Sequence, residues 1–316
     1  MSDWQLNTPV AFIIFNRPDT TERVFAEIAK ARPPKLLIIA DGPRENRPGE
    51  AEKCAATRAI IERVDWPCEV LTNYSEVNLG CKQRVSSGID WVFEQVPEAI
   101  ILEDDCLPHS SFFRFCEELL ERYRHDQRIG MISGDNFQFG RKRGDASYYF
   151  SRYNHIWGWA SWRRAWKYYD PNAAIWPEFR DNGWLKSVTN SRAELRYWTN
   201  TYQSVYEGLI DTWDYQWHLA NSGQGMISIM PSNNLISNIG FGTDATHTKS
   251  VNSIYAAMPV QSIDFPLTHP EIILPHLEAD AFTAKMVFST SLNRSILMKI
   301  KYLFSLHFKK PKRNAF

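Results

Sequence analysis

The chain has 316 residues, of which 44% are hydrophobic, so it is long enough for one large domain or two small ones with a substantial core. Its 36 Lys and Arg residues balance 36 Asp and Glu residues, which argues against a surface that binds nucleic acid as a whole. The five cysteines are scattered without CxxC spacing, which predicts reduced thiols in a cytoplasmic protein rather than disulfides or a zinc site. We expect neither a signal peptide nor a membrane span, because no leader pattern and no long apolar run occurs.

Short apolar runs alternate with helical patterns through the first third of the chain. The predicted strands cover residues 10–15, 36–41, 68–73 and 99–102. The helical patterns between them cover residues 16–30, 51–64 and 81–96. Because short buried strands that alternate with helices form parallel sheets, we expect a mostly parallel α/β sheet with helices on both faces and right-handed connections.

The pattern changes after Phe112, and nine of the twelve Trp residues lie between Trp157 and Trp217. Helices are predicted for 112–125, 156–170 and most of 176–225, and strands for 129–135, the end of 139–152 and parts of 225–242. No repeat, low-complexity segment or flexible linker divides the chain. We therefore expect residues 1–290 to form a single domain whose second half is helical and rich in aromatic residues.

Three consecutive carboxylates, Glu103, Asp104 and Asp105, follow directly after the predicted strand 99–102. In an open α/β sheet, ligands bind beyond the carboxyl ends of the strands, so these residues are candidates for a site. Adjacent carboxylates repel one another unless their pKa values rise or a cation lies between them, and Mg²⁺ and Mn²⁺ prefer such oxygen ligands. The alternative is an acidic turn or a helix N-cap, although Ser110 is the better cap.

Further polar residues lie at the ends of other elements, where they would share the same edge of the sheet. They are Asn16, Arg17, Asp41, Asn78, Lys82 and Arg84. In such a crevice an Asp hydrogen-bonds a base or ribose, and Arg or Lys binds phosphate or base, although each residue alone fits a turn or cap. Neither GxGxxG nor GxxxxGKS/T occurs, which argues against dinucleotide and P-loop sites.

The order of four motifs carries a family resemblance over residues 9–249: a strand ending in "FNRP", a strand ending in "ADGPR", "NLG" before a helix, and "IILEDD" followed by "FFRFCEELL". It resembles the GT-A glycosyltransferases, which use nucleotide-diphosphate sugars, and within them the bacterial family-2-like enzymes related to the N-acetylglucosaminyltransferase I group. In that group the DxD element is written EDD. The resemblance implies a Rossmann-like GT-A fold with a nucleotide-binding half at 9–107 and a donor-sugar and acceptor half at 108–250.

The same resemblance implies roles for individual residues. Asp105 would be the direct ligand of Mn²⁺ or Mg²⁺, Asp104 would contact the ribose or a metal-bound water, and Glu103 would contact the sugar or nucleotide. Arg17 and Asp41 match positions that hold the nucleoside. The "NLG" motif differs from the animal enzymes, so the identity of the base stays open.

The segment 156–170, "IWGWASWRRAWKYYD", resembles the part of the family that lines the donor sugar and the acceptor. Sugar rings pack their C–H faces on aromatic rings, so an exposed Trp suits such a site. Most of these Trp residues fit a core equally well. Trp157 and Trp159, which flank Gly158, are the better candidates for sugar contacts.

The stretch "DTWDYQW" supplies the expected catalytic carboxylate. An inverting transfer needs a base that takes the proton of the acceptor hydroxyl. In the similar enzymes a Trp-Asp pair at a helix start has this role, which matches Asp214; Asp211 is the alternate base or the helix N-cap. In the later Gly-containing loop 238–248, His247 is expected to contact the metal or phosphate, and Gly240 and Gly242 would let the loop close.

The C-terminal residues 291–316 combine apolar residues at helical spacing with a basic excess. This pattern predicts either an amphipathic helix in peripheral contact with the anionic inner face of the cell membrane, where lipid-linked acceptors lie, or a packed terminal helix.

Together these features predict a cytoplasmic, metal-dependent inverting glycosyltransferase of the hexosyl- or N-acetylhexosaminyl-transferase type. Its donor would be a nucleotide-diphosphate sugar and its acceptor a glycan or lipid-linked hydroxyl in surface polysaccharide synthesis. One alternative is a nucleotidyltransferase of sugar phosphates, although "FNRPDT" lacks the glycines that follow the first strand in that class. The other alternative is a non-catalytic glycan-binding protein.

Overall fold

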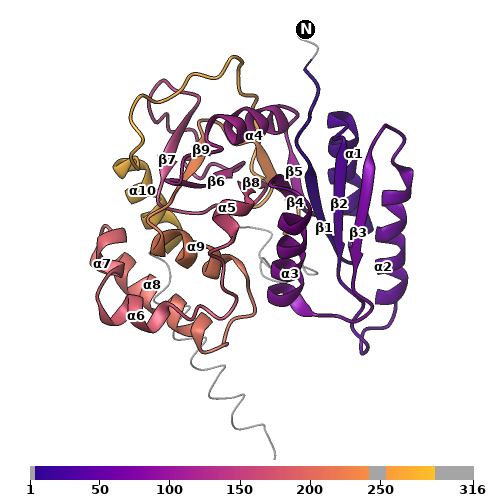
Figure 1. The fold of residues 1–316 in the computed structure, drawn as a ribbon, viewed down its shortest axis with the longest axis horizontal. Coiled ribbons are helices and arrows are strands. Elements are labelled where there is room, and N and C mark those ends of the chain that lie inside the picture. The colour runs from indigo at the N-terminus through magenta and orange to yellow at the C-terminus, as the bar shows by residue number, and fades with distance from the viewer. Residues whose placement is uncertain (1–3, 242–253, 289–316) are drawn as a thin grey trace, which may run out of the picture.

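An eight-stranded mixed sheet forms the centre of the protein in the computed structural model, which describes residues 4–241 and 254–288 (Figure 1). Its strands are β1 (Val10–Ile14), β2 (Lys35–Ala40), β3 (Glu69–Tyr74), β4 (Glu98–Glu103), β6 (Ile129–Ser133), β7 (Tyr148–Ser151), β8 (Trp159–Trp162) and β9 (Ile227–Pro231). Their order is β3-β2-β1-β4-β8-β6-β9-β7, with β7 and β8 antiparallel to their neighbours and the other pairs parallel. The predicted mostly parallel, Rossmann-like α/β sheet is confirmed.

Helices cover both faces of this sheet. One face carries α1 (Pro18–Ala31), α4 (Ser111–Arg122) and the 3-10 turn Ile60–Arg63 that follows α2 (Glu50–Ala59). The other face carries α3 (Gly80–Gln95), α5 (Arg163–Trp166) and α9 (Asp214–Gly223). Successive strand residues point to opposite faces, so Phe12 joins the first core and Ile13 the second, and β1 appears in the sequence as an unbroken apolar run.

The local sequence sets the limits of α1, and these limits determine where Arg17 lies. Pro18 occupies the first helical position, where its missing N–H is not needed, so Arg17 becomes the N-cap residue directly after β1. The helix ends at Arg32, which adopts a left-handed φ of 51°, before Pro33. Arg17 therefore lies at the carboxyl end of β1, beside the end of β4.

A small two-stranded sheet connects the acidic residues to a distant loop, and it was absent from the sequence prediction. β5 (Cys106–Pro108) pairs antiparallel with β10 (Ile236–Asn238), and Asn238 lies opposite Cys106. Three residues are too few for a periodic pattern. The pairing brings Ile239 to Asp105, whose carbonyl oxygen accepts a hydrogen bond of 2.9 Å from the Ile239 N–H.

The predicted helical, aromatic-rich part lies beside one half of the sheet, with α6 (Trp176–Asp181), α7 (Leu185–Val188) and α8 (Arg192–Tyr206) at the lower left of Figure 1 and α9 next to them. Two later elements, α10 (Leu277–Thr283) and a π-helical turn (Ala284–Phe288), follow outside the predicted part. A third core of mainly aromatic side chains joins α6–α9 to the π-helical turn, with Trp176, Trp198 and Tyr202 fully or almost fully buried.

The predicted Trp-rich helix over 156–170 is wrong in its first half. Trp159–Trp162 form strand β8 between β4 and β6, and only Arg163–Trp166 are helical as α5. Gly158 has φ of 64°, which a helix does not allow, and all four residues of β8 are buried within the sheet. Tertiary pairing overrides the i, i+4 spacing of Trp162 and Trp166.

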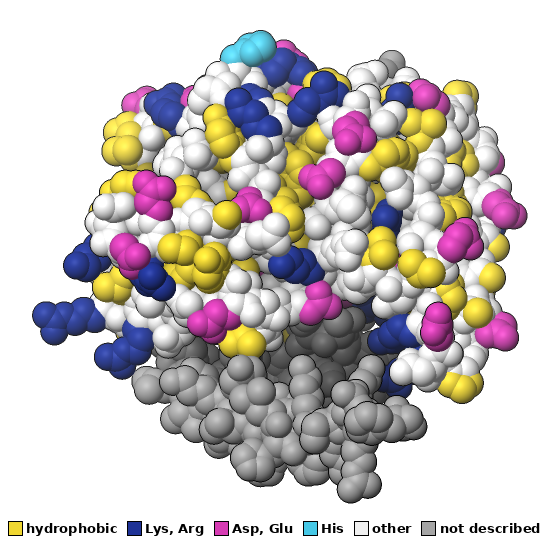
Figure 2. Space-filling model, turned by 60° about the horizontal axis from the view of Figure 1, so that its bottom comes forward, with side chains coloured by type: hydrophobic (Ala, Val, Ile, Leu, Met, Phe, Trp, Pro, Cys, Tyr) yellow, Lys and Arg dark blue, Asp and Glu magenta, His cyan; other side chains and the backbone are white. Residues whose placement is uncertain are grey.

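Strands of both predicted halves of the domain belong to the one large sheet. No helix within 4–241 and 254–288 is long and apolar enough to cross a membrane. The predicted basic tail at 291–316, His247 and Gly242 lie outside the described residues. On the face shown in Figure 2, Lys and Arg side chains are interspersed with Asp and Glu side chains and do not form one large patch.

Candidate functional site

The acidic residues at the end of β4 are bound by an arginine. Arg17 places Nη2 at 2.6 Å from Asp104 Oδ1 and Nη1 at 2.9 Å from Asp105 Oδ2. The Phe15 N–H donates to the second oxygen of Asp104 at 3.2 Å, and the Asp104 side chain is only 4% exposed. Asp104 is therefore held inside the protein by an ion pair.

Burial and like charges act on the titration of these carboxyl groups. Burial raises the pKa of Glu103, the charges of Asp105 and Asp104 raise it further, and the Arg17 guanidinium offsets part of the rise. Burial also raises the pKa of Asp104, again against the opposing effect of Arg17. The site as described thus favours proton uptake by Glu103 and Asp104.

In the structure Asp105 contacts Arg17 and the backbone of Gly240. A Cβ atom added at Gly240 would lie 2.0 Å from Asp105 Oδ2 and 2.7 Å from Arg17 Nη1, so the backbone of Gly240 packs against the ion pair. Within the described ranges no three His, Cys, Asp or Glu side chains are arranged to hold a metal ion. Metal binding at Asp105 and His247 stays a prediction, and it requires Arg17 and Gly240 to move away from Asp105.

Asp41 fixes the turn before α3 instead of facing a crevice. Its carboxylate accepts hydrogen bonds from the N–H groups of Gly42, Leu79 and Gly80 and from the amide of Asn78, at 2.9–3.1 Å. Two carboxylate oxygens accept about four hydrogen bonds, so these donors saturate Asp41. The structure therefore assigns Asp41 and Asn78 to the turn, and a nucleoside contact by Asp41 requires these bonds to break.

The other polar residues predicted for the crevice also contact protein. The amide of Asn16 donates to Glu50 at 2.8 Å, and Arg84, which is 6% exposed, donates to the side chain and carbonyl of Asn73. Arg84, a buried residue of α3, is thus engaged with Asn73 of β3, and binding of a phosphate by Arg84 stays a prediction. The Lys82 N–H donates to Asp211 at 3.0 Å. Asp211 therefore caps the start of α3, and not the start of α9 for which it was a candidate.

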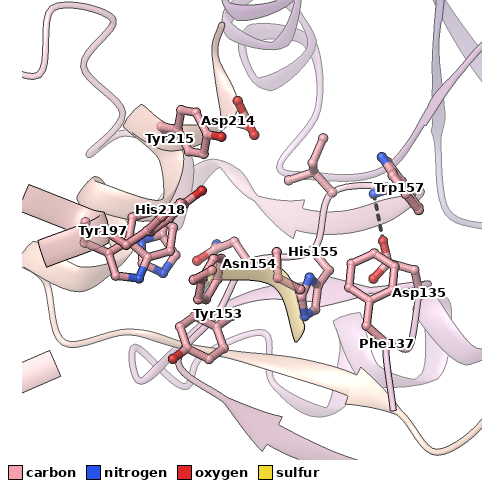
Figure 3. Close-up of a pocket in the computed structure, with 14 residues that line it drawn as sticks. Asp135, Phe137, Tyr153, Asn154, His155, Trp157, Tyr197, Asp214, Tyr215 and His218 are labelled. Atoms are coloured by element: carbon pink, nitrogen blue, oxygen red, sulfur yellow. Dashed lines mark hydrogen bonds between the residues drawn. The ribbon is translucent and has the colours of Figure 1, made fainter. Parts of the chain in front are cut away.

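A cavity of about 190 Å³ lies among the loops beyond β6 and β8 and the helices α8 and α9 (Figure 3). Asp135 follows β6, the segment 153–157 connects β7 to β8, and Asp214 and His218 extend from α9. Besides two histidines, the fourteen lining residues include seven Trp, Tyr and Phe side chains: Phe137, Tyr153, Trp157, Tyr197, Trp198, Tyr215 and Phe288. Two carboxyl groups surrounded by aromatic side chains suit a sugar with several hydroxyl groups better than a purely apolar ligand.

Asp214, the predicted base, is the first residue of α9 and lines this cavity. The Thr212 hydroxyl donates to Asp214 Oδ1, which helps to hold the carboxylate at the helix start. Burial is the main cause that raises the pKa of Glu103 and of the Cys81 thiol, and the charge of Asp214 contributes to both rises. Asp214 therefore lies within electrostatic range of the acidic strand end.

Asp135 is the second carboxylate of the cavity, and the sequence analysis did not identify it. It is 0% exposed and accepts hydrogen bonds from the Trp157 N–H at 3.2 Å, drawn in Figure 3, and from the Ser133 hydroxyl at 3.3 Å. Burial raises its pKa well above the ordinary value for Asp. The available signal was "SGD" at the end of the predicted strand 129–135, as Glu103–Asp105 lie at the end of β4.

The histidines of the cavity are held neutral. Burial lowers the pKa of His155 and of His218 to about 3. The ring of His218 stacks on Trp198 with centroids 4.0 Å apart, and its Nδ1 is hydrogen-bonded to the Tyr202 hydroxyl. None of the fourteen lining residues is Lys or Arg, so the cavity offers aromatic surface and acceptors without a fixed positive charge.

Of Trp157, Gly158 and Trp159, which were predicted to contact sugar, only Trp157 lines the cavity. Trp157 lines the cavity and meets Phe137 and Phe241 edge to face, the latter directly after Gly240. Gly158 is required by packing, because a Cβ atom there would lie 2.5 Å from Ile236. Trp159 is a correction: it is 1% exposed and stacks on Trp213 in the core, so its ring does not face a ligand.

Comparison with known proteins gives limited information. Neither protein-family models nor curated protein sequences match the chain. Among solved structures, 4-diphosphocytidyl-2C-methyl-D-erythritol synthase from Anaerococcus prevotii DSM 20548 is 9% identical with a TM-score of 0.31, over 64% of this chain and 84% of that one. UDP-glucose pyrophosphorylase complexed with UDP-glucose is 11% identical with a TM-score of 0.24, over 45% of this chain and 61% of that one. TM-scores below 0.5 establish neither a common fold nor a common activity.

Proposed function

We propose that the protein is a transferase that acts on a nucleotide-diphosphate sugar, and specifically an inverting glycosyltransferase. One observation carries the proposal: Asp214 lines an aromatic cavity and lies within electrostatic range of the acidic residues at the carboxyl end of β4. A base beside a sugar-sized cavity and a strand end at which ligands bind are the two parts that such a transfer needs. The acceptor is a hydroxyl of a glycan or of a lipid-linked sugar.

In the proposed reaction Asp214 takes the proton of the acceptor hydroxyl. The acceptor oxygen forms a bond with the anomeric carbon of the donor sugar, while the bond from that carbon to the diphosphate oxygen breaks. The electron pair of the broken bond leaves with the nucleoside diphosphate. Aromatic rings of the cavity such as Trp157 would hold the acceptor in the orientation that this in-line displacement requires.

A nucleotidyltransferase of sugar phosphates is the second candidate. Both solved structures compared above bear the names of enzymes of this kind, although their low scores do not decide between the two reactions. Two features of this chain favour glycosyl transfer: "FNRPDT" after β1 contains no glycine, and the described lining of the cavity has no Lys or Arg to bind a sugar phosphate. A non-catalytic glycan-binding protein would have the aromatic cavity without needing Asp214.

The products of the reaction separate these candidates. Purified protein is incubated with a panel of nucleotide sugars and, separately, with nucleoside triphosphates and sugar 1-phosphates, with Mn²⁺ or with EDTA. We expect a nucleoside diphosphate to be released from at least one nucleotide sugar. Release of pyrophosphate from a triphosphate and a sugar phosphate would instead establish the second candidate, and the absence of both products would leave glycan binding.

The EDTA sample tests the predicted metal separately. Release that stops with EDTA and returns with Mn²⁺ or Mg²⁺ would support a metal at Asp105. Release that continues in EDTA would mean that the Arg17 ion pair persists during the reaction. Contact of residues 291–316 with the membrane stays a prediction, to be tested by co-sedimentation of the full chain with anionic vesicles.

A further inference from the structure

A buried carboxylate without a cationic partner borders the cavity. Asp135 is fully buried, and no Lys or Arg within the described part of the chain pairs with it. Its two hydrogen bonds, from Trp157 and Ser133, are 3.2–3.3 Å long, longer than is usual for a charge-assisted bond. A carboxyl group accepts about four hydrogen bonds, so Asp135 retains capacity that the protein does not satisfy.

Such a group is costly in a folded protein unless a ligand contacts it. Ser133 and Trp157 fix its orientation from two sides, because the first precedes it by two residues and the second lies in the segment that connects β7 to β8. Figure 3 shows Asp135 beside the rings of Phe137 and Trp157, and Asp214 apart from them beside Tyr215. The cavity thus has two separate carboxyl groups within a lining that is mostly aromatic.

The charge of the lining limits which ligand can enter. None of the described residues that line the cavity is Lys or Arg, Asp214 is acidic, and the two histidines are buried among aromatic rings. An anionic group would lose its hydration without gaining a positive partner and would be repelled by Asp214. A sugar ring without a negative charge would instead place C–H faces on the rings and hydroxyl groups on the carboxyl groups.

We propose that the cavity binds a sugar ring that carries no carboxylate or phosphate, and that Asp135 determines this specificity by hydrogen-bonding the hydroxyl groups of the ring. The inference rests on the proposed function in taking this ring as part of the acceptor. Uronic acids and phosphorylated or sulfated sugars are excluded from the cavity.

Saturation-transfer NMR with a matched pair of probes tests the proposal. Methyl glucoside and methyl glucuronide differ only in a neutral CH₂OH and a carboxylate, and the methyl glycosides of galactose, mannose and N-acetylglucosamine extend the neutral set. We expect at least one neutral glycoside to bind and its matching uronide, or for N-acetylglucosamine the 6-phosphate, to bind at least tenfold more weakly. Equal binding of a neutral probe and its anionic counterpart, or binding of no glycoside at all, would overturn the proposal.

Variants identify the part of Asp135. Asp135→Leu should weaken neutral glycoside binding by roughly 10- to 100-fold, the range for a lost hydrogen bond to a carboxyl group. Asp135→Asn keeps the hydrogen-bonding shape and should stay within a few-fold of the wild type. Asp181→Leu, which replaces an exposed carboxylate on α6, is the control. Unchanged affinity in a folded Asp135→Leu protein would contradict the role of Asp135 in sugar binding. If this variant does not fold, the comparison of neutral and anionic glycosides with the wild-type protein tests the proposal.

Turnover of nucleotide sugars in the same wild-type samples separates the two proposals. Turnover without discrimination between the glycosides would refute the specificity of the cavity and leave the proposed function standing. Selective glycoside binding without turnover of any nucleotide sugar would refute the transferase.

Discussion

At the scale of single residues, Arg17 determines the state of the acidic strand end. Three carboxyl groups follow one another at Glu103–Asp105, and one guanidinium bridges two of them. The Arg17 side chain is 27% exposed and that of Asp104 only 4%, so the pair is mostly shielded from water. Removing one partner of such a pair is costly because it leaves the other charge buried and unpaired.

We therefore predict that Arg17→Met lowers the free energy of unfolding by about 3 kcal/mol, at the low end for a broken buried pair because Asp104 can take up a proton. Urea unfolding of the variant and the wild type measures the difference. Arg63→Met is the control, since Arg63 pairs with Glu22 on the surface and its loss should cost at most about 1 kcal/mol. Equal effects of the two substitutions would show that the Arg17 pair contributes no more than a surface contact.

The Arg17→Met variant also tests metal binding by the acidic residues, without an activity assay. If the acidic residues can bind a divalent cation once Arg17 is gone, Mn²⁺ should raise the melting temperature of Arg17→Met more than that of the wild type.

At the scale of elements, the turn before α3 is held by two carboxylates of different exposure. Asp41 is buried and accepts hydrogen bonds from Asn78, Leu79 and Gly80, whereas Asp211 is exposed and accepts one from the Lys82 N–H. A helix has unpaired N–H groups at its start, and both carboxylates satisfy some of them. The buried one also joins β2 to the turn, since Asp41 directly follows that strand.

We predict that Asp41→Ala destabilises the protein by roughly 2–3 kcal/mol, because several buried donors lose a charged acceptor. Asp211→Ala should cost about 1 kcal/mol, the usual effect of losing an exposed helix cap. Urea unfolding of the two variants gives the comparison. A larger loss for Asp211→Ala would mean that the turn is held mainly from the α9 side.

The regular elements were predictable because their signals are local. The strands β1, β2 and β4 contain unbroken apolar runs, and α1, α3 and α4 show a helical apolar face, so their types and approximate limits follow from the sequence. β8 was not predictable from periodicity, since its four buried residues owe their strand conformation to β4 and β6 on either side. β5 and β10 are each three residues long and exist as strands only because they pair.

At the scale of the whole molecule, the cavity combines residues that are far apart in the chain. Asp135, the segment 153–157, Trp198 and Asp214 come from four different parts of the fold. The family resemblance pointed to Trp157 and Asp214, which do line the cavity. Asp135 and the histidines were missed because nothing in their local sequence shows that the sheet brings them to Asp214. Likewise, the sequence showed the charge of Glu103–Asp105 but not that Arg17 neutralises part of it.

The account of function depends most on Asp214, and one kinetic measurement tests it directly: the rate of nucleoside diphosphate release from the nucleotide sugar that the wild type uses. We predict that Asp214→Asn lowers kcat at least about 100-fold, the usual contribution of a general base, with little change in KM for the nucleotide sugar. Asp211→Asn should stay within a few-fold of the wild type, because Asp211 caps α3 and does not line the cavity. An unchanged kcat in a folded Asp214→Asn protein, or a loss confined to Asp211→Asn, would contradict the assignment of Asp214 as the base.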